Sequence, residues 1–245
     1  MNHPRSAFGA PPQGGAASGP AKPDPRPPLD AATTTRRDFD RVSAAVVASA
    51  RALPTATLHE AGGKIGALPS IIKPIASSFR CCGPALTVHS PGGDNLWLHR
   101  ALDIAQPGDV LVVHVSGAYE HGYWGEIMTT MAKARGLAAL VIDGCVRDGV
   151  LLEQIGFPVF ARGLCIRGTG KDYGATGWLN APVLIGDVKV SAGDLVVGDT
   201  DGVVVVPRLR AAEVVAKSQQ RERDEAAILK RLEAGESTMQ VYGFH

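Results

Sequence analysis

The feature that most constrains the fold is the alternation of helix and strand patterns between residues 125 and 161. Residue spacing predicts a helix over residues 125–135, a strand over 137–142, a helix over 147–155 and a strand over 157–161. A strand, a helix and a second strand of these lengths form a parallel crossover unit. The chain is therefore expected to form an α/β fold.

Further elements are expected before this alternation. We expect strands over residues 84–89 and 109–115, and helices over residues 38–52, within LPTATLHEAG and within DNLWLHRALDIAQPGD. Asp94 or Asn95 is expected to be the N-cap of the last of these helices, because short polar side chains accept hydrogen bonds from free N–H groups. That helix is expected to stop at Pro107-Gly108.

After Pro182 the pattern changes to short β-segments. VLIGDVKV and DLVVGDTDGVVVVP contain Gly-Asp and Asp-Gly turns, so they predict a meander or hairpins. A long charged helix over residues 208–234 follows, which either packs on a neighbouring subunit or lies free in solvent. We expect one domain over residues 35–245, behind a disordered Pro/Gly/Ala-rich tail over residues 1–34.

Composition argues against several classes of function. The 25 basic and 24 acidic residues nearly cancel, so bulk charge gives no reason to expect nucleic-acid binding. No apolar run approaches the roughly 18 residues that a membrane span needs, and neither GxxxxGK[ST] nor a strand–GxGxxG–helix unit is present. The four cysteines form no CxxC pair or disulfide framework, and the N-terminus has no apolar signal region. A cytoplasmic protein with reduced thiols is expected.

Charged residues begin two of the expected helices, one crossover apart. Glu126 follows Gly125 in one helix, and Arg147-Asp148 opens the next, with 20 residues between Glu126 and Arg147. Ligands in open α/β sheets bind beyond the carboxyl ends of strands, and a right-handed crossover of this length could return the chain to the same edge. Two interpretations stay open from spacing alone: a catalytic constellation, or a surface ion pair at a helix start.

The catalytic interpretation has a definite chemistry. Free N–H groups at the helix start can hold a carboxylate, and Gly125 lets a ligand approach closely. Arg147 can bind a second ligand oxygen. A single carboxylate, Asp148, suits Mg²⁺ or Mn²⁺, which keep several waters, and Glu126 could accept from such a water. The set predicts chelation of a 2-oxo acid and stabilisation of its enolate. His121, in the loop before, could reach the ligand or simply be exposed.

Several motifs in the same order resemble the RraA-like family. They are GGDNLWLHRALDIAQPGDVLVVH, GEIMTTMAKARGLAALVIDGCVRD, GFPVFARG and GDLVVGDTDGVVVVP, and the resemblance covers about residues 58–207. That family includes class II 4-hydroxy-4-methyl-2-oxoglutarate / 4-carboxy-4-hydroxy-2-oxoadipate aldolases. The resemblance implies a single swivelling, phosphohistidine-domain-like α/β sandwich with parallel crossover units, a C-terminal β-meander and a long terminal helix. It also implies a homotrimer or homohexamer.

The resemblance also implies roles for individual residues. The family's aldolases carry an acidic residue, 20 intervening residues and then Arg-Asp, which here are Glu126, Arg147 and Asp148. Asp148 is implied to ligate the divalent cation, Mg²⁺ or Mn²⁺. Arg147 and Glu126 are implied to be catalytic, and the substrate is implied to contact Arg147 and the backbone of Gly125, Glu126, Ile127 and Met128. The best-known aldolase pattern has Asp where this chain has Glu126. The side chain of Glu126 is one methylene longer, which could shift the water that it is meant to orient.

The expected activity is metal-dependent retro-aldol cleavage of a 4-hydroxy-2-oxo acid to release pyruvate, with oxaloacetate decarboxylation through the same enolate chemistry. No nucleic-acid or membrane partner is expected. The same family contains non-catalytic regulators that bind and inhibit RNase E, in a branch that lacks the Asp after the Arg. Asp148 therefore favours an enzyme over a regulator. A lyase of the same fold acting on another 2-oxo acid is the third alternative.

Overall fold

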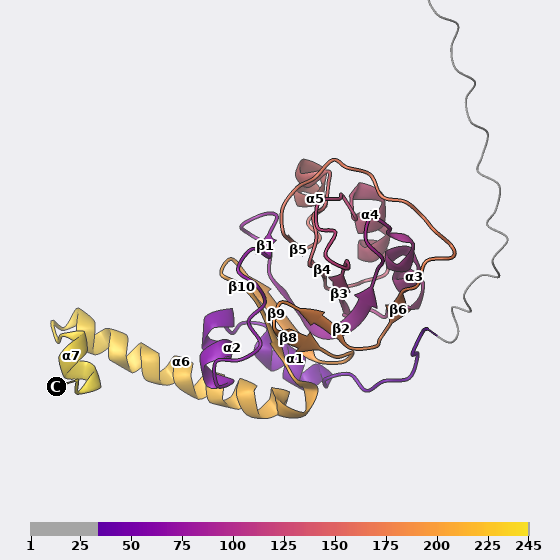
Figure 1. The fold of residues 1–245 in the computed structure, drawn as a ribbon. Coiled ribbons are helices and arrows are strands. Elements are labelled where there is room, and N and C mark those ends of the chain that lie inside the picture. Colours follow the sequence, from indigo (N-terminus) through magenta and orange to yellow (C-terminus); the bar gives the residue numbers. More distant parts are fainter. Residues whose placement is uncertain (1–33, 245) are drawn as a thin grey trace, which may run out of the picture.

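The computed structural model describes residues 34–244. Apart from Thr34, the expected disordered tail lies outside the described residues. Within this part of the chain, no helix is long and apolar enough to cross a membrane. Figure 1 shows helices α3, α4 and α5 (Leu96–Ile104, Glu126–Ala134 and Gly149–Ile155) gathered at one end of the molecule. Helices α1, α2 and α6 (Ala44–Ala50, Thr55–Ala61 and Ala211–Glu233) lie at the other end.

The predicted crossover units form a parallel sheet. Four strands lie side by side in parallel, namely β2 (Cys81–His89), β3 (Val110–His114), β4 (Ala139–Ile142) and β5 (Val159–Ala161). Two short strands, β1 (Lys73–Pro74) and β6 (Trp178–Leu179), pair antiparallel with β5 and β2. Helices α3, α4 and α5 connect the parallel strands in order, which confirms the predicted α/β class.

The C-terminal β-segments form hairpins, as predicted. Strands β9 (Leu195–Asp199) and β10 (Gly202–Val206) pair antiparallel, as do β7 (Val183–Ile185) and β8 (Val188–Val190). Strand β2 joins the two halves, because its first residues pair with β9 and its last residues pair with β3. The sheet therefore runs from parallel to antiparallel pairing along one strand and wraps into a near-barrel.

Both faces of the parallel strands are buried. Successive residues of one strand belong to different clusters: Val112 packs with the β7–β10 layer and Val113 packs with the helices. This explains why the strands read as continuous apolar runs without alternation. Each large side chain that is fully buried, such as Trp97 or Phe160, stabilises the fold by about 1.5–3 kcal/mol. The rigid sheet that results fixes the loops at its carboxyl edge.

Several predicted boundaries are wrong, including the following three. The helix expected over residues 38–52 begins only at Ala44, because the Val42 N–H donates to the Gly193 carbonyl (2.9 Å) and holds the preceding residues extended. Strand β2 begins at Cys81, three residues early, where it meets β9. Helix α5 begins at Gly149, after the Arg-Asp pair.

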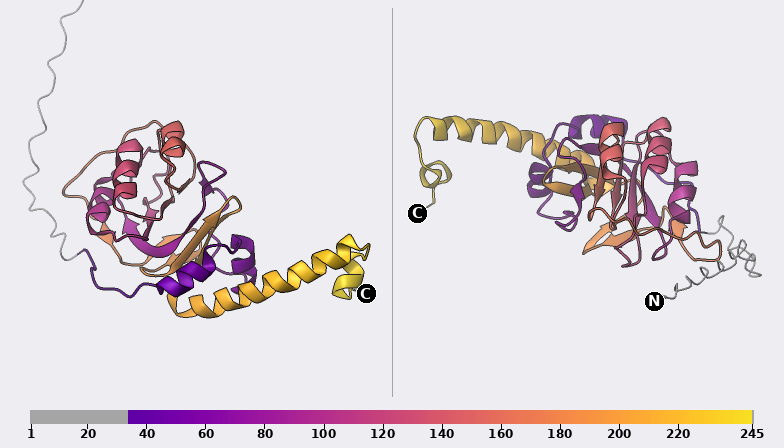
Figure 2. Two further views of the ribbon diagram at one scale, coloured as in Figure 1. Left: turned by 180° about the vertical axis from the view of Figure 1, so that it is seen from behind. Right: turned by 90° about the horizontal axis from the view of Figure 1, so that it is seen from above.

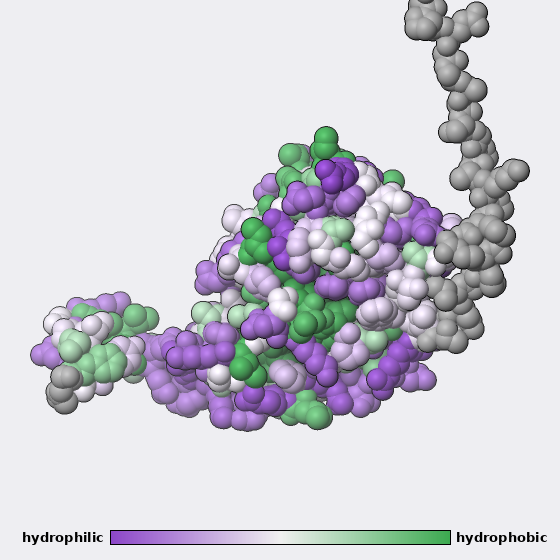
Figure 3. Space-filling model, in the orientation of Figure 1, coloured by the Kyte–Doolittle hydropathy of each residue, from purple (hydrophilic) through white to green (hydrophobic). Residues whose placement is uncertain are grey.

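Helix α6 leaves the body of the molecule as a long projection (Figures 1 and 2). A short 3-10 turn (Arg208–Arg210) leads into it, and a small helix, α7 (Thr238–Tyr242), follows it. The first half of α6 is packed on the body: its buried residues are Ala211, Val214, Val215 and Ser218, and Glu222 accepts a hydrogen bond from Thr57 Oγ1 of α2 at 2.6 Å. The long terminal helix predicted from the sequence is confirmed, and most of its length is exposed (Figure 3).

Candidate active site

The structure brings Glu126, Arg147 and Asp148 together beyond the carboxyl ends of β3 and β4. The Glu126 backbone N–H donates to Asp148 Oδ2 at 3.0 Å, and Arg147 Nε lies 3.8 Å from the same oxygen. Gly125 is the N-cap of α4, and Glu126 is its first residue. The side chain of Ile127 is 80% exposed, whereas that of Met128 is buried. The crossover therefore returns the chain to the same edge.

Asp148 reaches this position through an uncommon backbone conformation. It is the N-cap of α5, with φ 62° and ψ 35°, in the left-handed region that Asp tolerates better than most residues. Its side chain makes no capping bond to its own helix. The carboxylate turns instead to the N-terminus of α4 and accepts from Glu126. Asp148 thus caps a helix that belongs to the previous crossover, where the helix dipole favours its negative charge.

Two glycines make room for the Arg147-Asp148 pair. A Cβ atom at Gly125 would overlap Asp148 Oδ2 and would lie 3.1 Å from Arg147 Cγ. At Gly122 a Cβ atom would lie 2.5 Å from the Cys165 carbonyl oxygen and 3.1 Å from Arg147 Cβ. Both glycines are required for space, so the loop backbone packs directly on the arginine and the aspartate.

The loop over residues 122–125 is held by neighbouring segments. The Arg147 N–H donates to the Trp124 carbonyl (2.8 Å), and Asn95 Nδ2 donates to the Tyr123 carbonyl (2.9 Å). Asn95 is 7% exposed. Asp94 Oδ1 accepts from Leu96 N (2.7 Å), so it provides the first-turn acceptor of α3, whereas the Asn95 side chain makes no cap bond. Asp94 therefore makes the cap bond that was expected of Asp94 or Asn95, and Asn95 supports the loop beside the site.

Several polar groups at the site are free to bind a ligand. Arg147 and Asp148 have side chains 48% and 35% exposed. Among residues 34–244, Asp148 Oδ1 has no hydrogen-bond donor, and the N–H groups of Ile127 and Met128 have no acceptor. The Glu126 carboxylate is likewise unpaired within the described chain. The site therefore offers a cation, backbone donors and two carboxylates at one edge of the sheet.

The donor set fits a hydrated divalent cation. No group of three His, Cys, Asp or Glu side chains suited to a metal occurs among the described residues. Zinc normally takes three or four protein ligands, so the side chains at this site are a poor match for zinc. Mg²⁺ and Mn²⁺ bind through one or two carboxylates and keep several waters. The free Oδ1 of Asp148 matches that second pattern.

Two half-buried histidines at the same edge do not join the site. His89 and His114 end strands β2 and β3, and their Nδ1 atoms lie 3.1 Å apart. Burial, followed by the proximity of His114, lowers the pKa of His89 to about 4, and burial also lowers the pKa of His114. Val88 and Val113 pack with the helices, so the histidines that follow them point to the opposite face. The pair lies away from α4.

His121, the other histidine considered from the sequence, lies in the loop before Gly125. Its ring packs against Gly93, and its buried Nδ1 has no partner within residues 34–244. All four cysteines, which lie in the described part of the chain, are free.

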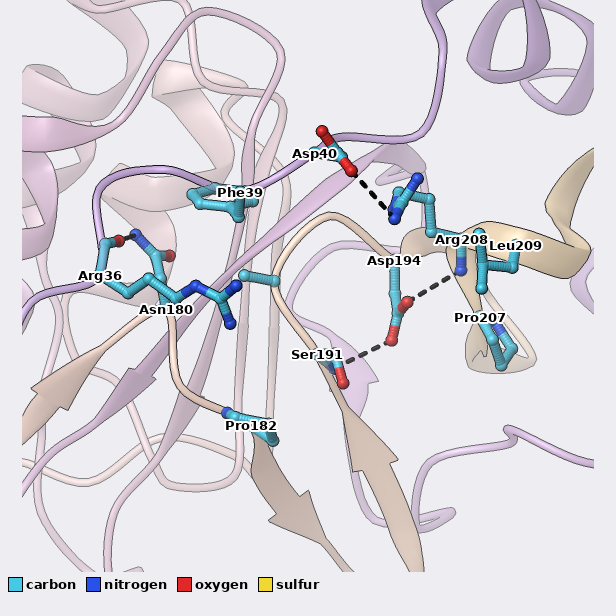
Figure 4. A pocket seen from close by; sticks show the side chains of 11 residues that line it. Arg36, Phe39, Asp40, Asn180, Pro182, Ser191, Asp194, Pro207, Arg208 and Leu209 are labelled. Atoms are coloured by element: carbon cyan, nitrogen blue, oxygen red, sulfur yellow. Dashed lines mark hydrogen bonds and ion pairs between the residues drawn. The ribbon is translucent and has the colours of Figure 1, made fainter.

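A polar cavity of about 340 Å³ lies at the start of α6, next to the β8–β9 turn (Figure 4). Asp194 is 7% exposed there and accepts from the backbone N–H groups of Ser191 and Arg208, each at 2.9 Å. Burial raises the pKa of Asp194. The Arg208 side chain pairs with Asp40 at 3.2 Å. These groups join three chain segments to one another, so we assign the cavity a structural role.

Comparison with known proteins agrees with this architecture. The model of the RraA-like family, described as Aldolase/RraA, matches residues 41–205. A protein of Halalkalibacterium halodurans, provisionally named 4-hydroxy-4-methyl-2-oxoglutarate aldolase, is 36% identical over 177 residues, covering 72% of this chain and 83% of that protein.

Two solved structures are similar throughout. An uncharacterized protein of Pseudomonas syringae pv. tomato has a TM-score of 0.74 at 30% identity, covering 85% of this chain and 97% of that chain. RraAS2 of Streptomyces coelicolor is described as an unusual member of the RNase ES inhibitor RraA protein family. It has a TM-score of 0.68 at 30% identity, covering 77% of this chain and 98% of that chain. The family match spans well over half of the sequence, and the chain belongs to the RraA-like (Aldolase/RraA) family.

Proposed function

We propose that the chain is a divalent-metal-dependent aldolase that cleaves a 4-hydroxy-2-oxo acid and releases pyruvate. The observation that carries the proposal is the Asp148 carboxylate, which the left-handed backbone holds beside Arg147 with one oxygen free. The aldolase name of the Halalkalibacterium relative supports this reaction class. The substrate class of 4-hydroxy-4-methyl-2-oxoglutarate or 4-carboxy-4-hydroxy-2-oxoadipate follows from the same family.

The protein's own groups bind the pyruvyl half of the substrate. The unpaired N–H groups of Ile127 and Met128, at the positive end of α4, receive the carboxylate. The Arg147 guanidinium binds the 2-oxo oxygen through its planar set of N–H donors. Asp148 Oδ1 would hold the divalent cation with its waters, and Glu126 would accept a hydrogen bond from one of those waters. When bound, that cation supplies positive charge opposite the oxygens of the 2-oxo acid.

The reaction needs one proton acceptor and one stabilised negative charge. Glu126, acting directly or through a water, accepts the proton of the 4-hydroxyl group. The C3–C4 bond then breaks, its electron pair moves to C3, and C4 becomes a carbonyl. Arg147 stabilises the negative charge on the pyruvyl oxygen, an effect of about 3 kcal/mol for a single well-placed donor. Protonation at C3 gives pyruvate, and the same charge stabilisation supports oxaloacetate decarboxylation.

A non-catalytic regulator of an RNA-degrading enzyme is the second candidate. The similarity to the Streptomyces member of the RNase ES inhibitor family favours it. A homotrimer or homohexamer fits both functions and belongs to the proposal. The exposed, unpaired groups around Asp148 favour the aldolase, because protein docking alone requires no free carboxylate beside an arginine.

A coupled assay tests the proposal. Candidate 4-hydroxy-2-oxo acids and oxaloacetate are incubated with the protein, and pyruvate is detected with lactate dehydrogenase and NADH. We expect pyruvate release with added Mg²⁺ or Mn²⁺ and none after treatment with a chelator. No release from any acid, or release that a chelator leaves unchanged, would contradict the proposal. Inhibition of an RNase E-type enzyme in a parallel assay would support the regulator.

A further inference from the structure

A serine and two histidines are in contact at the ends of strands β2 and β3. Ser116 Oγ lies 3.2 Å from His89 Nε2, and His89 Nδ1 lies 3.1 Å from His114 Nδ1. The parallel pairing of β2 with β3 places the two histidines opposite one another (Figure 1). On its other side, His89 is paired with Trp178 of β6, and the two rings are stacked with their centroids 3.6 Å apart. The sheet therefore fixes the position of both histidines.

The hydrogen bonds indicate which ring nitrogen of each histidine carries the proton. The Ser116 backbone N–H donates to His114 Nδ1 at 3.4 Å, so this nitrogen presents its lone pair. Because His89 Nδ1 lies against the same lone pair, it is the protonated nitrogen of its ring, and His89 Nε2 is left as an acceptor for the Ser116 hydroxyl. The three side chains therefore have the contacts of a nucleophile, a base and a group that orients the base.

Ser116 lies in a turn that follows β3 directly. Its backbone has φ 53°, in the left-handed region that serine rarely adopts, and the next residue, Gly117, has φ 77°. Both residues are exposed. The Ser116 hydroxyl also reaches the Ser90 carbonyl at 2.9 Å, which keeps Oγ beside His89. A serine in a strained turn at the end of a parallel strand is also the arrangement that exposes the nucleophile of α/β hydrolases.

A free backbone donor follows the serine. Within residues 34–244, the Gly117 N–H has no acceptor. A Cβ atom at Gly117 would meet nothing within 4 Å, so there is open space beside this residue. In α/β hydrolases the N–H of the residue after the nucleophile stabilises the negative charge that develops on the substrate's carbonyl oxygen. The Gly117 N–H is available for this role.

We propose that Ser116, His89 and His114 form a second catalytic site, which hydrolyses activated esters. Ser116 Oγ attacks the carbonyl carbon while its proton moves to His89 Nε2, and the Gly117 N–H donates to the oxygen that becomes negative. The bond between the carbonyl carbon and the leaving oxygen then breaks. The leaving group departs with the electron pair of that bond and takes the proton from His89. A water, deprotonated by His89, attacks the acyl-serine in the same way and releases the acid.

The basicity of His89 limits the substrates of this site. Burial, followed by the proximity of His114, lowers the pKa of His89 to about 4. At neutral pH its Nε2 is therefore unprotonated, but it is a weak base. A weak base gives measurable turnover only when the carbonyl carbon is strongly electrophilic and the leaving group is good. Esters of phenols meet both conditions, whereas amides and simple alkyl esters do not.

Hydrolysis of p-nitrophenyl acetate tests the proposal. The assay contains a chelator, because the reaction needs no divalent cation and is thereby separated from the proposed aldolase. Ser116→Gly removes the hydroxyl and keeps a residue that adopts positive φ, and His89→Phe removes the base but keeps a ring against Trp178. Each should lower the protein-dependent rate at least about tenfold. After quenching with acid, mass spectrometry of the wild type should find the acetyl group on Ser116.

Ser78→Gly is the matched control for the loss of a serine. Ser78 is exposed in a turn and has no hydrogen-bonded histidine in the described part of the chain, so this variant should hydrolyse the ester at the wild-type rate. The unfolding temperatures of all variants, measured by circular dichroism, should agree within about 2 °C.

The role of His114 is tested by a pair of variants. His114→Asn supplies an amide oxygen that can accept from His89 Nδ1, so its rate should stay within about threefold of the wild type. His114→Leu has no acceptor and should lose at least about tenfold. The inference fails if the wild type does not accelerate hydrolysis or if Ser116→Gly retains the wild-type rate. It also fails if the acetyl group is found only on lysines.

Discussion

Two Arg–Asp pairs lie at the same edge of the sheet, and they differ in almost every physical respect. Asp143 follows β4 directly and pairs with Arg162, which follows β5, at 2.7 Å, with side chains 3% and 22% exposed. The Arg162 guanidinium also stacks on the Tyr119 ring, 3.7 Å from its centroid. Arg147 and Asp148 are 3.8 Å apart, with side chains 48% and 35% exposed.

The difference shows what makes a charged pair available for chemistry. Arg162 and Asp143 neutralise one another in a nearly dry environment, so breaking either leaves an unpaired buried charge. Arg147 and Asp148 are adjacent in sequence, and the left-handed backbone of Asp148 turns its carboxylate toward α4. Their long contact leaves a guanidinium and a carboxylate oxygen free. We therefore propose that the Asp143–Arg162 pair stabilises the fold and that the Arg147–Asp148 pair binds the ligand.

The largest effect is expected from Asp148→Asn. Asn tolerates the left-handed conformation and keeps an acceptor for the Glu126 N–H, so the fold should be retained. The charge that would hold a divalent cation is lost. We expect pyruvate release to fall at least about a thousandfold, with an unfolding temperature within about 2 °C of the wild type. Activity within tenfold of the wild type would show that Asp148 is only a helix cap.

Asp143→Asn should have the opposite effect, a loss of stability with little loss of activity. The substitution leaves the Arg162 guanidinium without its carboxylate, so the free energy of unfolding should fall by about 3 kcal/mol. Urea denaturation measures the change, and kcat of the folded protein should stay within about threefold of the wild type. The double variant Asp143→Leu/Arg162→Met should recover much of the loss. Equal stability of Asp143→Asn and the wild type would remove the contrast between the two pairs.

Gly125→Ala tests the space between the loop and the open pair. The new methyl group must displace the Asp148 carboxylate, and a shift of about 1 Å at a reacting group costs about a hundredfold in rate. We expect that loss in kcat with little change in the unfolding temperature. Gly168→Ala, at a position where a Cβ atom meets nothing within 4 Å and the backbone does not need a positive φ, controls for the loss of a glycine. Equal activities in the two variants would contradict the close packing.

Asn95→Leu should give the smallest effect, about a tenfold fall in kcat. Its side chain loses the hydrogen bond to the Tyr123 carbonyl, so the loop that supports Gly125 becomes less ordered while Asp148 and Arg147 remain. Steady-state kinetics should show a lower kcat and a nearly unchanged cation dependence. A large loss of cation affinity would place Asn95 in direct contact with the ligand sphere instead.

The meeting of Glu126 with Arg147-Asp148 could be predicted from the sequence, because one helix plus one strand returns the chain to the same sheet edge. The conformation of Asp148 could not. Its left-handed φ depends on the space left by Gly125, and helix periodicity does not encode that contact. The contact of Asn95 could not be predicted for a similar reason: its partner is a carbonyl 28 residues away, which no local pattern reveals.

The most direct test measures Mn²⁺ affinity of the wild type, Asp148→Asn and Asp143→Asn in the presence of pyruvate. Electron paramagnetic resonance monitors the binding. We expect one bound Mn²⁺ per chain in the wild type and in folded Asp143→Asn. Affinity in Asp148→Asn should be at least about a hundredfold weaker. Unchanged Mn²⁺ affinity in Asp148→Asn would contradict the assignment of the open pair as the metal and substrate site.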